Sequence, residues 1–319
     1  MSTPAATASA YTATPATAAF LIFLRLALTR VVLPGTGLGH AIHRLSARVL
    51  PDRAGFGLGV GLCAIPVPVH YVERGEGTPV LLLHGAGVDH REPLGTIDSA
   101  FAHPSGYRRI YPDLPGHGRT PAPESIRSAD DVLGALLDLI DDLAGDEPLL
   151  VAGHSAGGYY ARAIARRRPE QVIGLALICP LLEDVRDVPR HAPVVQEDLD
   201  GEHEAFRSYF VVQTWAMLRS YAENVAPGVE AADSAALARI GERWRLTGAE
   251  PERPYAGPVL VVAGRHDSAV GYAAQWDLVQ ASPRGTFAML DRAGHALPHE
   301  QPELLAALLR EWLRRVENP

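Results

Sequence analysis

From about residue 64 onward, short apolar runs alternate with segments whose apolar residues recur at helical spacing. The runs 79–84 (PVLLLH) and 148–153 (PLLVAG) are short and continuous, as expected for central parallel strands. Further strand-like runs are 67–73, 109–113, 172–179, 258–264 and 286–290. Strands that alternate with amphipathic helices predict an α/β fold, with a mostly parallel central sheet and crossover helices on both faces.

Two of the intervening helices show their starting points. Ser128 and Asp131 form a candidate capping box, and Pro302 suits the first turn of the last helix. The apolar face predicted for the first helix consists of Val132, Leu133, Leu136, Leu137, Ile140 and Leu143. The buried stripe predicted for the last helix consists of Leu304, Leu305, Leu308, Leu309 and Trp312. The last helix is expected to close the domain.

The segment 180–253 interrupts this alternation. It has no strand-like run, is mostly helical in pattern, and is far longer than the roughly 2 to 6 residues that usually join such elements. Its aromatic residues are Phe206, Tyr209, Phe210, Trp215, Tyr221 and Trp244. We therefore predict a helical lid over 180–253, inserted between the two parts of an α/β core at 61–179 and 254–319. Most lid aromatics are expected to fill the lid's own small core.

The first 60 residues read as an N-terminal extension. Residues 1–19 are almost wholly Ala, Thr, Ser and Pro and are predicted to be disordered. Residues 20–33 are apolar but interrupted by Arg25 and Arg30, so they predict a short amphipathic helix and no stable membrane span. The positive charges lie inside and after the apolar run, which disfavours a signal peptide.

Composition and charge limit the classes of molecule that the protein is expected to bind. The 319 residues carry a net charge of −8, and no basic run exceeds 166–168, so the sequence lacks the electrostatic footprint of a nucleic-acid-binding protein. The two cysteines, Cys63 and Cys179, lie far apart without a CxxC motif, and H-E-x-x-H is missing. We expect a small-molecule substrate, no cofactor, no metal and a cytoplasmic location, with secretion or membrane association through 20–33 as the alternative. A homodimer is compatible with the sequence, which does not fix the oligomeric state.

The sharpest chemical signal is GHSAG at 153–157, directly after a strand-like run and directly before a helical one. A serine on a tight strand-to-helix turn presents its hydroxyl out of the sheet, and glycines flank it because side chains would clash in the bend. The N-terminus of the following helix favours the negative charge that develops during attack. Ser155 is therefore the predicted nucleophile.

A serine hydroxyl needs a base within hydrogen-bond reach and a carboxylate that orients this base. His295 lies in the loop between the last strand-like run and the last helix, and Asp267 directly follows the run 258–264. We predict His295 as the base and Asp267 as the acid. Glu183 or Asp184 is the alternative acid, and His299 is the alternative base.

Five motifs combine around these residues: HGAG at 84–87, PDLPGHGRT at 112–120, GHSAGG at 153–158, GRHD at 264–267 and AGHALPHEQPE at 293–303. With them, roughly residues 64–316 resemble the α/β-hydrolase superfamily, in its branch of lidded esterases, C–C hydrolases and haloperoxidase-like enzymes. The resemblance implies the α/β-hydrolase fold, the chain order Ser, Asp, His for the triad, and an oxyanion hole formed by the backbone N–H groups of Ala86 and Ala156. His90, beside the HGAG loop, and Phe206, Tyr209 and Trp215 of the predicted lid are the candidate substrate contacts.

The first functional hypothesis is hydrolysis of a carboxylic ester or lactone of a small to medium, largely apolar molecule through an acyl-enzyme. A C–C hydrolase of ring-cleavage products uses the same triad, but this chain has His154 and Ala156 where those enzymes usually have Asn and Met. Serine at position 155 argues against the related dehalogenases and epoxide hydrolases, which need a carboxylate there. A receptor with a vestigial site is the third hypothesis.

Overall fold

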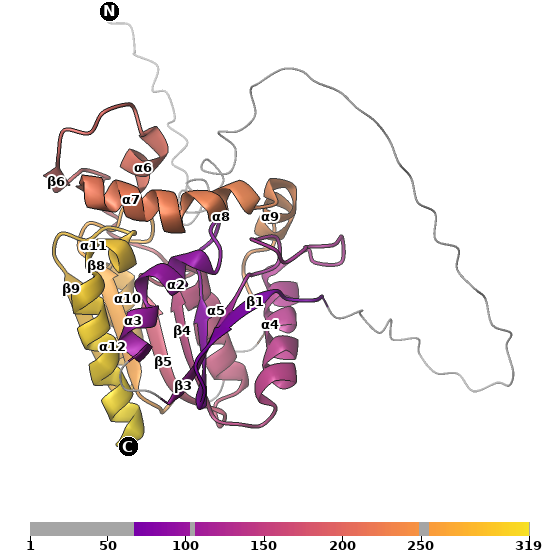
Figure 1. The fold of residues 1–319 in the computed structure, drawn as a ribbon. Coiled ribbons are helices and arrows are strands. Elements are labelled where there is room, and N and C mark those ends of the chain that lie inside the picture. Colours follow the sequence, from indigo (N-terminus) through magenta and orange to yellow (C-terminus); the bar gives the residue numbers. More distant parts are fainter. Residues whose placement is uncertain (1–66, 103–105, 249–254, 319) are drawn as a thin grey trace, which may run out of the picture.

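The computed structural model describes residues 67–102, 106–248 and 255–318 (Figure 1). The predicted extension 1–60 with its helix at 20–33, the start of the predicted core with Cys63, and residues 249–253 of the predicted lid lie outside the described residues. Within the described ranges, no helix is long and apolar enough to cross a membrane.

A seven-stranded sheet forms the centre of the described chain, in the order β1-β3-β2-β4-β5-β8-β9. The strands are β1 (Tyr71–Arg74), β2 (Thr78–Leu83), β3 (Tyr107–Pro112), β4 (Leu149–His154), β5 (Val172–Ile178), β8 (Val259–Gly264) and β9 (Gly285–Leu290). Strand β1 runs antiparallel to β3, and the other neighbours are parallel. The mostly parallel sheet and all seven predicted strands are thus confirmed, although β1 begins at Tyr71 rather than at residue 67.

Helices cover both faces of this sheet, as the alternating pattern predicted. Helices α4 (Ala129–Ala144) and α5 (Ala156–Arg167) pack on one face, and α3 (Asp98–Ala102) and α12 (Pro302–Glu317) pack on the other. Helix α10 (Ala273–Gln280) contacts β8 and β9. The continuous apolar runs of β2, β4 and β8 are needed because side chains on both sides of these strands enter a core.

The two predicted helix starts are confirmed, with small differences in which residues are buried. The Asp131 backbone N–H donates to the Ser128 hydroxyl at the start of α4, at 3.3 Å. In α12, Leu305, Leu309, Trp312 and Leu313 form the buried stripe, whereas Leu304 is 51% exposed. The prediction for Leu304 was wrong because the stripe at i, i+4, i+7 and i+8 faces the sheet, and the residue before it points to solvent.

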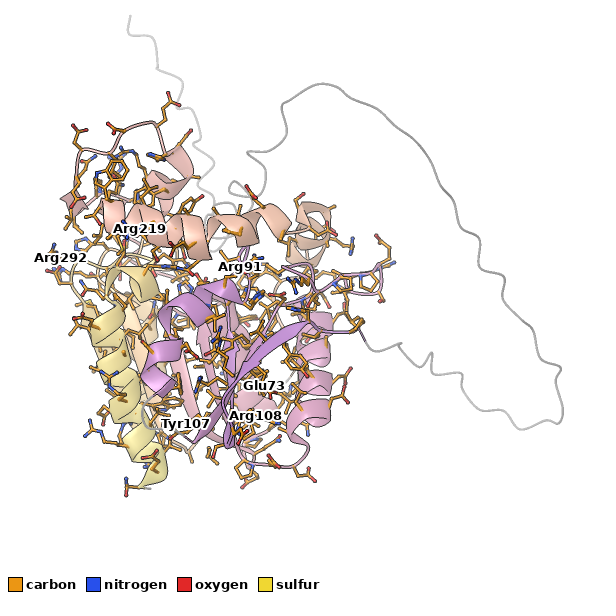
Figure 2. The ribbon with its side chains drawn as sticks, in the orientation of Figure 1. Glu73, Arg91, Tyr107, Arg108, Arg219 and Arg292 are labelled. Carbon is orange, nitrogen blue, oxygen red and sulfur yellow. The ribbon has the colours of Figure 1, made fainter. Side chains whose placement is uncertain are left out.

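The segment 180–248, which we call the cap segment, lies over the carboxyl ends of the parallel strands (Figure 1). It contains α6 (Glu204–Tyr209), α7 (Trp215–Asn224), α8 (Ala226–Ala231) and α9 (Ser234–Gly241). The expectation of no strand here was wrong, because β6 (Val195–Gln196) and β7 (Val212–Gln213) pair in parallel. Helices α2 (Arg91–Thr96) and α11 (Leu297–Glu300) lie at the same end of the molecule. Arg91 marks the cap end and Tyr107 the opposite end of the sheet in Figure 2.

Candidate active site

Three of the predicted site residues come together where the parallel strands end. Ser155 directly follows β4, Asp267 lies just beyond β8, and His295 lies in the loop after β9. Strand β5 separates β4 from β8, and β9 is the outer neighbour of β8. Carboxyl ends of parallel strands meet at one edge of a sheet, so the topology brings these positions to one place.

The turn at Ser155 is a strained elbow. Ser155 has φ 53° and ψ −117°, a left-handed conformation that non-glycine residues rarely adopt. A Cβ atom on Gly157 would lie 2.3 Å from the carbonyl oxygen of Leu83, and one on Gly153 would lie 2.3 Å from the carbonyl carbon of Gly157. The close approach of the chain to itself therefore requires glycine on both sides of the serine.

A chain of hydrogen bonds links the three side chains. The Ser155 Oγ lies 2.9 Å from His295 Nε2, and His295 Nδ1 lies 2.9 Å from Asp267 Oδ2. All three residues are buried. Burial by itself would raise the pKa of Asp267, but the contact with His295 and two backbone N–H donors, from Ala269 and Val270, lower it below its usual value. Asp267 is thus held as an anion that accepts a hydrogen bond from the His295 Nδ1–H.

The alternative acid and base are engaged elsewhere. Glu183 accepts a hydrogen bond from the Tyr159 hydroxyl at 3.0 Å, and its neighbour Asp184 is exposed. His299 Nδ1 lies 2.8 Å from the Ser220 Oγ on α7. Burial lowers the pKa of His299 to about 4, and its Nε2 is buried without a hydrogen-bond partner among the described residues. The geometry therefore favours His295 and Asp267 over these residues.

Two neutral histidines hold the loop after β2. His84 Nε2 accepts the Leu114 backbone N–H at 2.9 Å, so the proton sits on Nδ1, which contacts the Gly85 carbonyl at 2.6 Å. His117 Nε2 accepts the Gly87 N–H at 3.0 Å. Burial lowers the pKa of His84, and it lowers the pKa of His117 to about 3. Both imidazoles therefore stay uncharged and fix the loop that carries Ala86.

A small cavity of about 30 Å³, which has room for about two waters, adjoins Ser155 and His295. Its lining consists of Gly85, Ala86, Gly87, Val88, Glu92, His154, Ser155, Tyr209, Tyr221, Val225, Val229, Ala232 and His295. Ala86 of the predicted oxyanion hole is in this wall, and Ala156 is the first residue of α5, next to Ser155. The cap segment thus forms much of the apolar part of the wall.

The structure places the four predicted substrate contacts differently. Tyr209 lines the cavity, and its ring lies edge-on to His295 with centroids 6.2 Å apart. Phe206 is buried in the cap against Phe210, and Trp215 is 47% exposed at the start of α7. The described residues that line the cavity do not include Phe206, Trp215 or His90. Sequence spacing did not show how the cap helices are rotated about their axes, and this rotation decides which aromatic residues reach the cavity.

His90 belongs instead to a network around Asp113. The Asp113 carboxylate contacts His90 Nδ1 and His70 Nδ1, each at 2.8 Å, and also accepts the backbone N–H groups of His90 and Arg119. These four contacts tie the ends of β1 and β3 to the start of α2. Because every contact is already a hydrogen bond, the His70, His90 and Asp113 group is accounted for without a metal.

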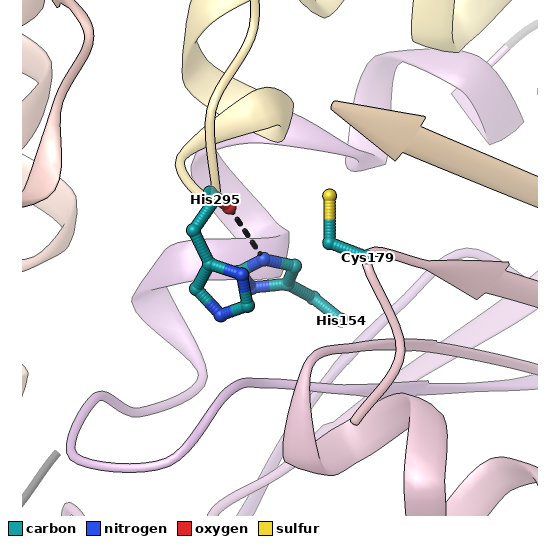
Figure 3. A group of neighbouring side chains, drawn as sticks. All are labelled: His154, Cys179 and His295. Atoms are coloured by element: carbon teal, nitrogen blue, oxygen red, sulfur yellow. Dashed lines mark hydrogen bonds between the residues drawn. The ribbon is translucent and has the colours of Figure 1, made fainter. Parts of the chain in front are cut away.

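A second group of metal-type donors lies in the site itself. Figure 3 shows His154, Cys179 and His295, whose donor atoms lie within 4.8 Å of one another. Both nitrogens of each histidine are engaged in hydrogen bonds, and burial near Asp267 raises the pKa of the Cys179 thiol well above its usual value. A metal would need a thiolate and free imidazole lone pairs, so this donor set as placed does not suit one.

Two buried carboxylates at the site were missed in the sequence. Glu92, in the first turn of α2, contacts His154, and Glu300 accepts three backbone N–H groups, from Gly294, Val211 and Val212. Burial raises the pKa of Glu300 to about 7. Glu92 and His154 are 62 positions apart, so no local pattern could reveal their contact.

Comparisons with known proteins agree with this fold. A model described as the alpha/beta hydrolase family matches residues 80–308. The crystal structure of an alpha/beta superfamily hydrolase from Oenococcus oeni is 28% identical, with a TM-score of 0.72, and the match covers 78% of this chain and 96% of that one.

Two relatives are similar in sequence. The 2-hydroxymuconate semialdehyde hydrolase of Pseudomonas putida is 26% identical over 265 residues, which cover 77% of this chain and 90% of that enzyme. The lipase LipV of Mycobacterium tuberculosis is 40% identical over 119 residues, which cover 36% and 42% of the two chains. The family model spans well over half of the sequence. The chain therefore belongs to the alpha/beta hydrolase family.

Proposed function

We propose that the protein is a serine hydrolase that cleaves a carboxylic ester or lactone through an acyl-enzyme. The observation that carries the proposal is the continuous hydrogen-bond chain from Ser155 through His295 to Asp267. The distance between the donor and acceptor atoms is 2.9 Å in each of its two hydrogen bonds. A nucleophile, a base and an orienting carboxylate in this arrangement are what acyl transfer to water requires.

In the first half of the reaction, His295 Nε2 takes the Ser155 hydroxyl proton while Oγ attacks the carbonyl carbon of the ester. His295 then gives this proton to the departing alkoxide, which leaves as an alcohol. In the second half, His295 takes a proton from water, the hydroxide attacks the acyl-enzyme, and the proton returns to Ser155 as the carboxylic acid leaves. Asp267 remains ionised and holds the His295 Nδ1 proton throughout.

The backbone N–H groups of Ala86 and Ala156 are proposed to bind the oxyanion. The placement of Ala86 in the cavity wall and of Ala156 at the N-terminus of α5, directly after the nucleophile, supports this role. The neutral His84 and His117 hold the loop in place, so the donors are already arranged before the substrate binds.

The cavity suggests a short acyl group. Ala86, Val88, Val225, Val229 and Ala232 give the wall an apolar character, and the space of about 30 Å³ is small. The sequence predicts a small to medium, largely apolar substrate, and the volume supports an acyl chain of few carbons. For larger substrates we propose that the cap segment acts as a lid and has to move.

A C–C hydrolase is the second candidate, because the Pseudomonas putida relative is named as a 2-hydroxymuconate semialdehyde hydrolase. Ring-cleavage products of this kind carry a carboxylate, which needs a positive group in the pocket. No lysine or arginine is among the described residues that line the cavity, and the one cationic side chain proposed there, His154, is already paired with Glu92. The lining therefore supports ester hydrolysis better than C–C bond hydrolysis. Loss of the absorbance of a dienoate ring-cleavage product on addition of the protein would instead favour the C–C hydrolase.

The direct test is turnover of p-nitrophenyl acetate and butyrate by the wild type and by Ser155→Ala. We expect the substitution to lower kcat by roughly a thousandfold or more, because the nucleophile is lost. Ser208→Ala, at an exposed serine of α6, is the matched control and should retain full activity. Retention of activity by Ser155→Ala would refute the proposed nucleophile, and a wild type that neither hydrolyses these esters nor forms a fluorophosphonate adduct at Ser155 would favour a receptor.

A further inference from the structure

The Glu92 carboxylate lies at the junction of four parts of the site. Its Oε2 accepts the backbone N–H of Gly85 at 2.9 Å. Gly85 belongs to the loop 84–87 after β2, which carries Ala86 and which we call the oxyanion loop. Its Oε1 lies 3.1 Å from His154 Nδ1, on the residue before the nucleophile, and 3.4 Å from the hydroxyl of Tyr209, on the cap segment. His154 Nε2 in turn contacts the main-chain carbonyl oxygen of His295 at 2.9 Å (Figure 3). One carboxylate thus connects the oxyanion loop, the elbow at Ser155, the cap segment and, through His154, the loop 291–296 that carries His295, which we call the histidine loop.

The partners of His154 determine where its protons lie. The His295 carbonyl oxygen can only accept, so Nε2 must carry a proton. An ionised Glu92 can also only accept, so Nδ1 carries a second proton and the ring is an imidazolium. Burial alone would raise the pKa of Glu92 and lower that of His154, yet their contact reverses both directions. The pair is therefore a buried ion pair, with both side chains 1% exposed.

Gly85 lies close to this pair and to the nucleophile. A Cβ atom on Gly85 would lie 3.3 Å from His154 Nδ1 and 3.4 Å from the Ser155 Cβ. Little more than the width of a methyl group therefore separates Gly85 from the imidazolium and from the nucleophile. A shift of about 1 Å in reacting groups can cost on the order of a hundredfold in rate.

We propose that Glu92 is a positioning residue for the hydrolysis proposed above, which fixes the oxyanion loop through Gly85 and the main chain of His295 through His154. The inference rests on the proposed function, since the groups that Glu92 positions are those of the serine mechanism. Glu92 takes part in no covalent step and transfers no proton. Its contribution comes from holding three donors, the Gly85 N–H, the His154 Nδ1–H and the Tyr209 hydroxyl, at fixed distances.

Two substitutions distinguish the effect of the length of the Glu92 side chain from the effect of its charge. In Glu92→Gln, the amide oxygen can accept the Gly85 N–H, and the amide NH₂ can donate to a neutral His154, whose Nε2 proton still reaches the His295 carbonyl. In Glu92→Asp, the charge stays, but the side chain is one methylene shorter and cannot keep both contacts at their present lengths. A positioning role predicts that Gln preserves the rate better than Asp, and a purely electrostatic role predicts the reverse.

The experiment measures the second-order rate of fluorophosphonate labelling at Ser155, together with kcat and KM for p-nitrophenyl acetate. Circular dichroism first establishes that each variant is folded at the assay temperature. We expect Glu92→Asp to label and turn over about 10- to 100-fold more slowly, with KM within about twofold. Glu92→Gln should stay within about fivefold of the wild type, and Glu303→Gln, at an exposed residue of α12, should equal it.

The outcomes distinguish the two proposals. A wild type that labels at Ser155 while Glu92→Asp labels equally fast, or faster than Glu92→Gln, would overturn the positioning role and leave the hydrolase intact. A wild type that does not label would overturn the hydrolase itself and the positioning role with it. Loss of activity that appears only as a raised KM would also contradict positioning, because the reacting groups would then still be aligned.

Discussion

The histidine loop is held by two buried carboxylates whose surroundings differ in one respect. Glu92, on the side of the oxyanion loop, faces the cationic His154, whereas Glu300, on the side of the cap segment, contacts backbone N–H groups of Gly294, Val211 and Val212. The pKa of Glu92 is lowered, and that of Glu300 is raised to about 7. The full positive charge of His154 outweighs the effect of burial on the pKa of Glu92. The three backbone N–H dipoles at Glu300, which also lies near Asp267, do not outweigh the effect of burial on its pKa.

This difference also separates what the two carboxylates do. Glu92 is an anion over the whole neutral range and forms a fixed part of the site. Glu300 changes its charge near neutral pH, and its partners lie in the histidine loop and at the start of β7 in the cap segment. The contacts between the cap segment and the core therefore include a group that titrates near neutral pH, whereas Glu92 keeps its charge there.

The largest effect is expected from removal of the Glu92 side chain. Glu92→Ala removes the anion that keeps the buried His154 charged and leaves the Gly85 N–H without its acceptor, which should cost about 3 to 5 kcal/mol in the free energy of unfolding. Urea unfolding near pH 7 measures this loss, and Glu303→Ala is the surface control. A loss below about 1 kcal/mol would show that the ion pair is absent and would remove the contrast with Glu300.

The next effect is a pH dependence that belongs to Glu300. The pKa of this group is about 7 in the folded chain against an ordinary 4.5, so the folded state binds the proton more tightly. Its stabilising contribution is fully present below pH 4.5 and is lost as the pH rises through 7. Glu300→Gln does not titrate, so the wild type should lose about 3 kcal/mol relative to this variant between roughly pH 4 and 8.

Urea unfolding of the wild type and Glu300→Gln at several pH values measures this difference. Other titrating groups are shared by the two proteins and cancel. A difference that stays constant across the pH range would contradict the assignment. Glu92 has the opposite sign, since its contribution is present above pH 4.5 and is lost as the pH falls through its lower folded pKa.

The smallest effect is expected at Tyr209. Its hydroxyl reaches Glu92 at 3.4 Å, a long contact, while its ring lies edge-on to His295. Tyr209→Phe removes the hydroxyl and keeps the ring, so kcat/KM for p-nitrophenyl acetate should change less than about threefold, which is below about 1 kcal/mol. A tenfold loss would show that the cap contact to Glu92 matters as much as the contacts within the core.

Much of the fold could be predicted because buried parallel strands have continuous apolar sequences. The positions of Ser155, Asp267 and His295 could be predicted for a related reason, since each follows a strand and lies in a recognisable motif. The contact of Glu92 with His154 could not be predicted, because it joins α2 to the end of β4 through three-dimensional packing alone.

The cap segment was predicted less well than the core. Its helices are short, and the β6–β7 pair consists of strands of two residues, too short for an alternating pattern to identify. Which aromatic side chain reaches the cavity depends on how each helix packs, so Tyr209 lines it while Trp215 faces solvent. The meeting of Ser155, Asp267 and His295 was therefore readable from the sequence, and the shape of the adjoining cavity was not.

The central claim is that Ser155 is an activated nucleophile, and covalent labelling tests it most directly. Wild-type protein treated with a fluorophosphonate and digested for mass spectrometry should carry one adduct, on Ser155, and Ser155→Ala should carry none. Asp267→Asn should label far more slowly, since the asparagine no longer holds the His295 tautomer that accepts the serine proton. An unlabelled wild type, or an adduct that persists in Ser155→Ala, would contradict the account.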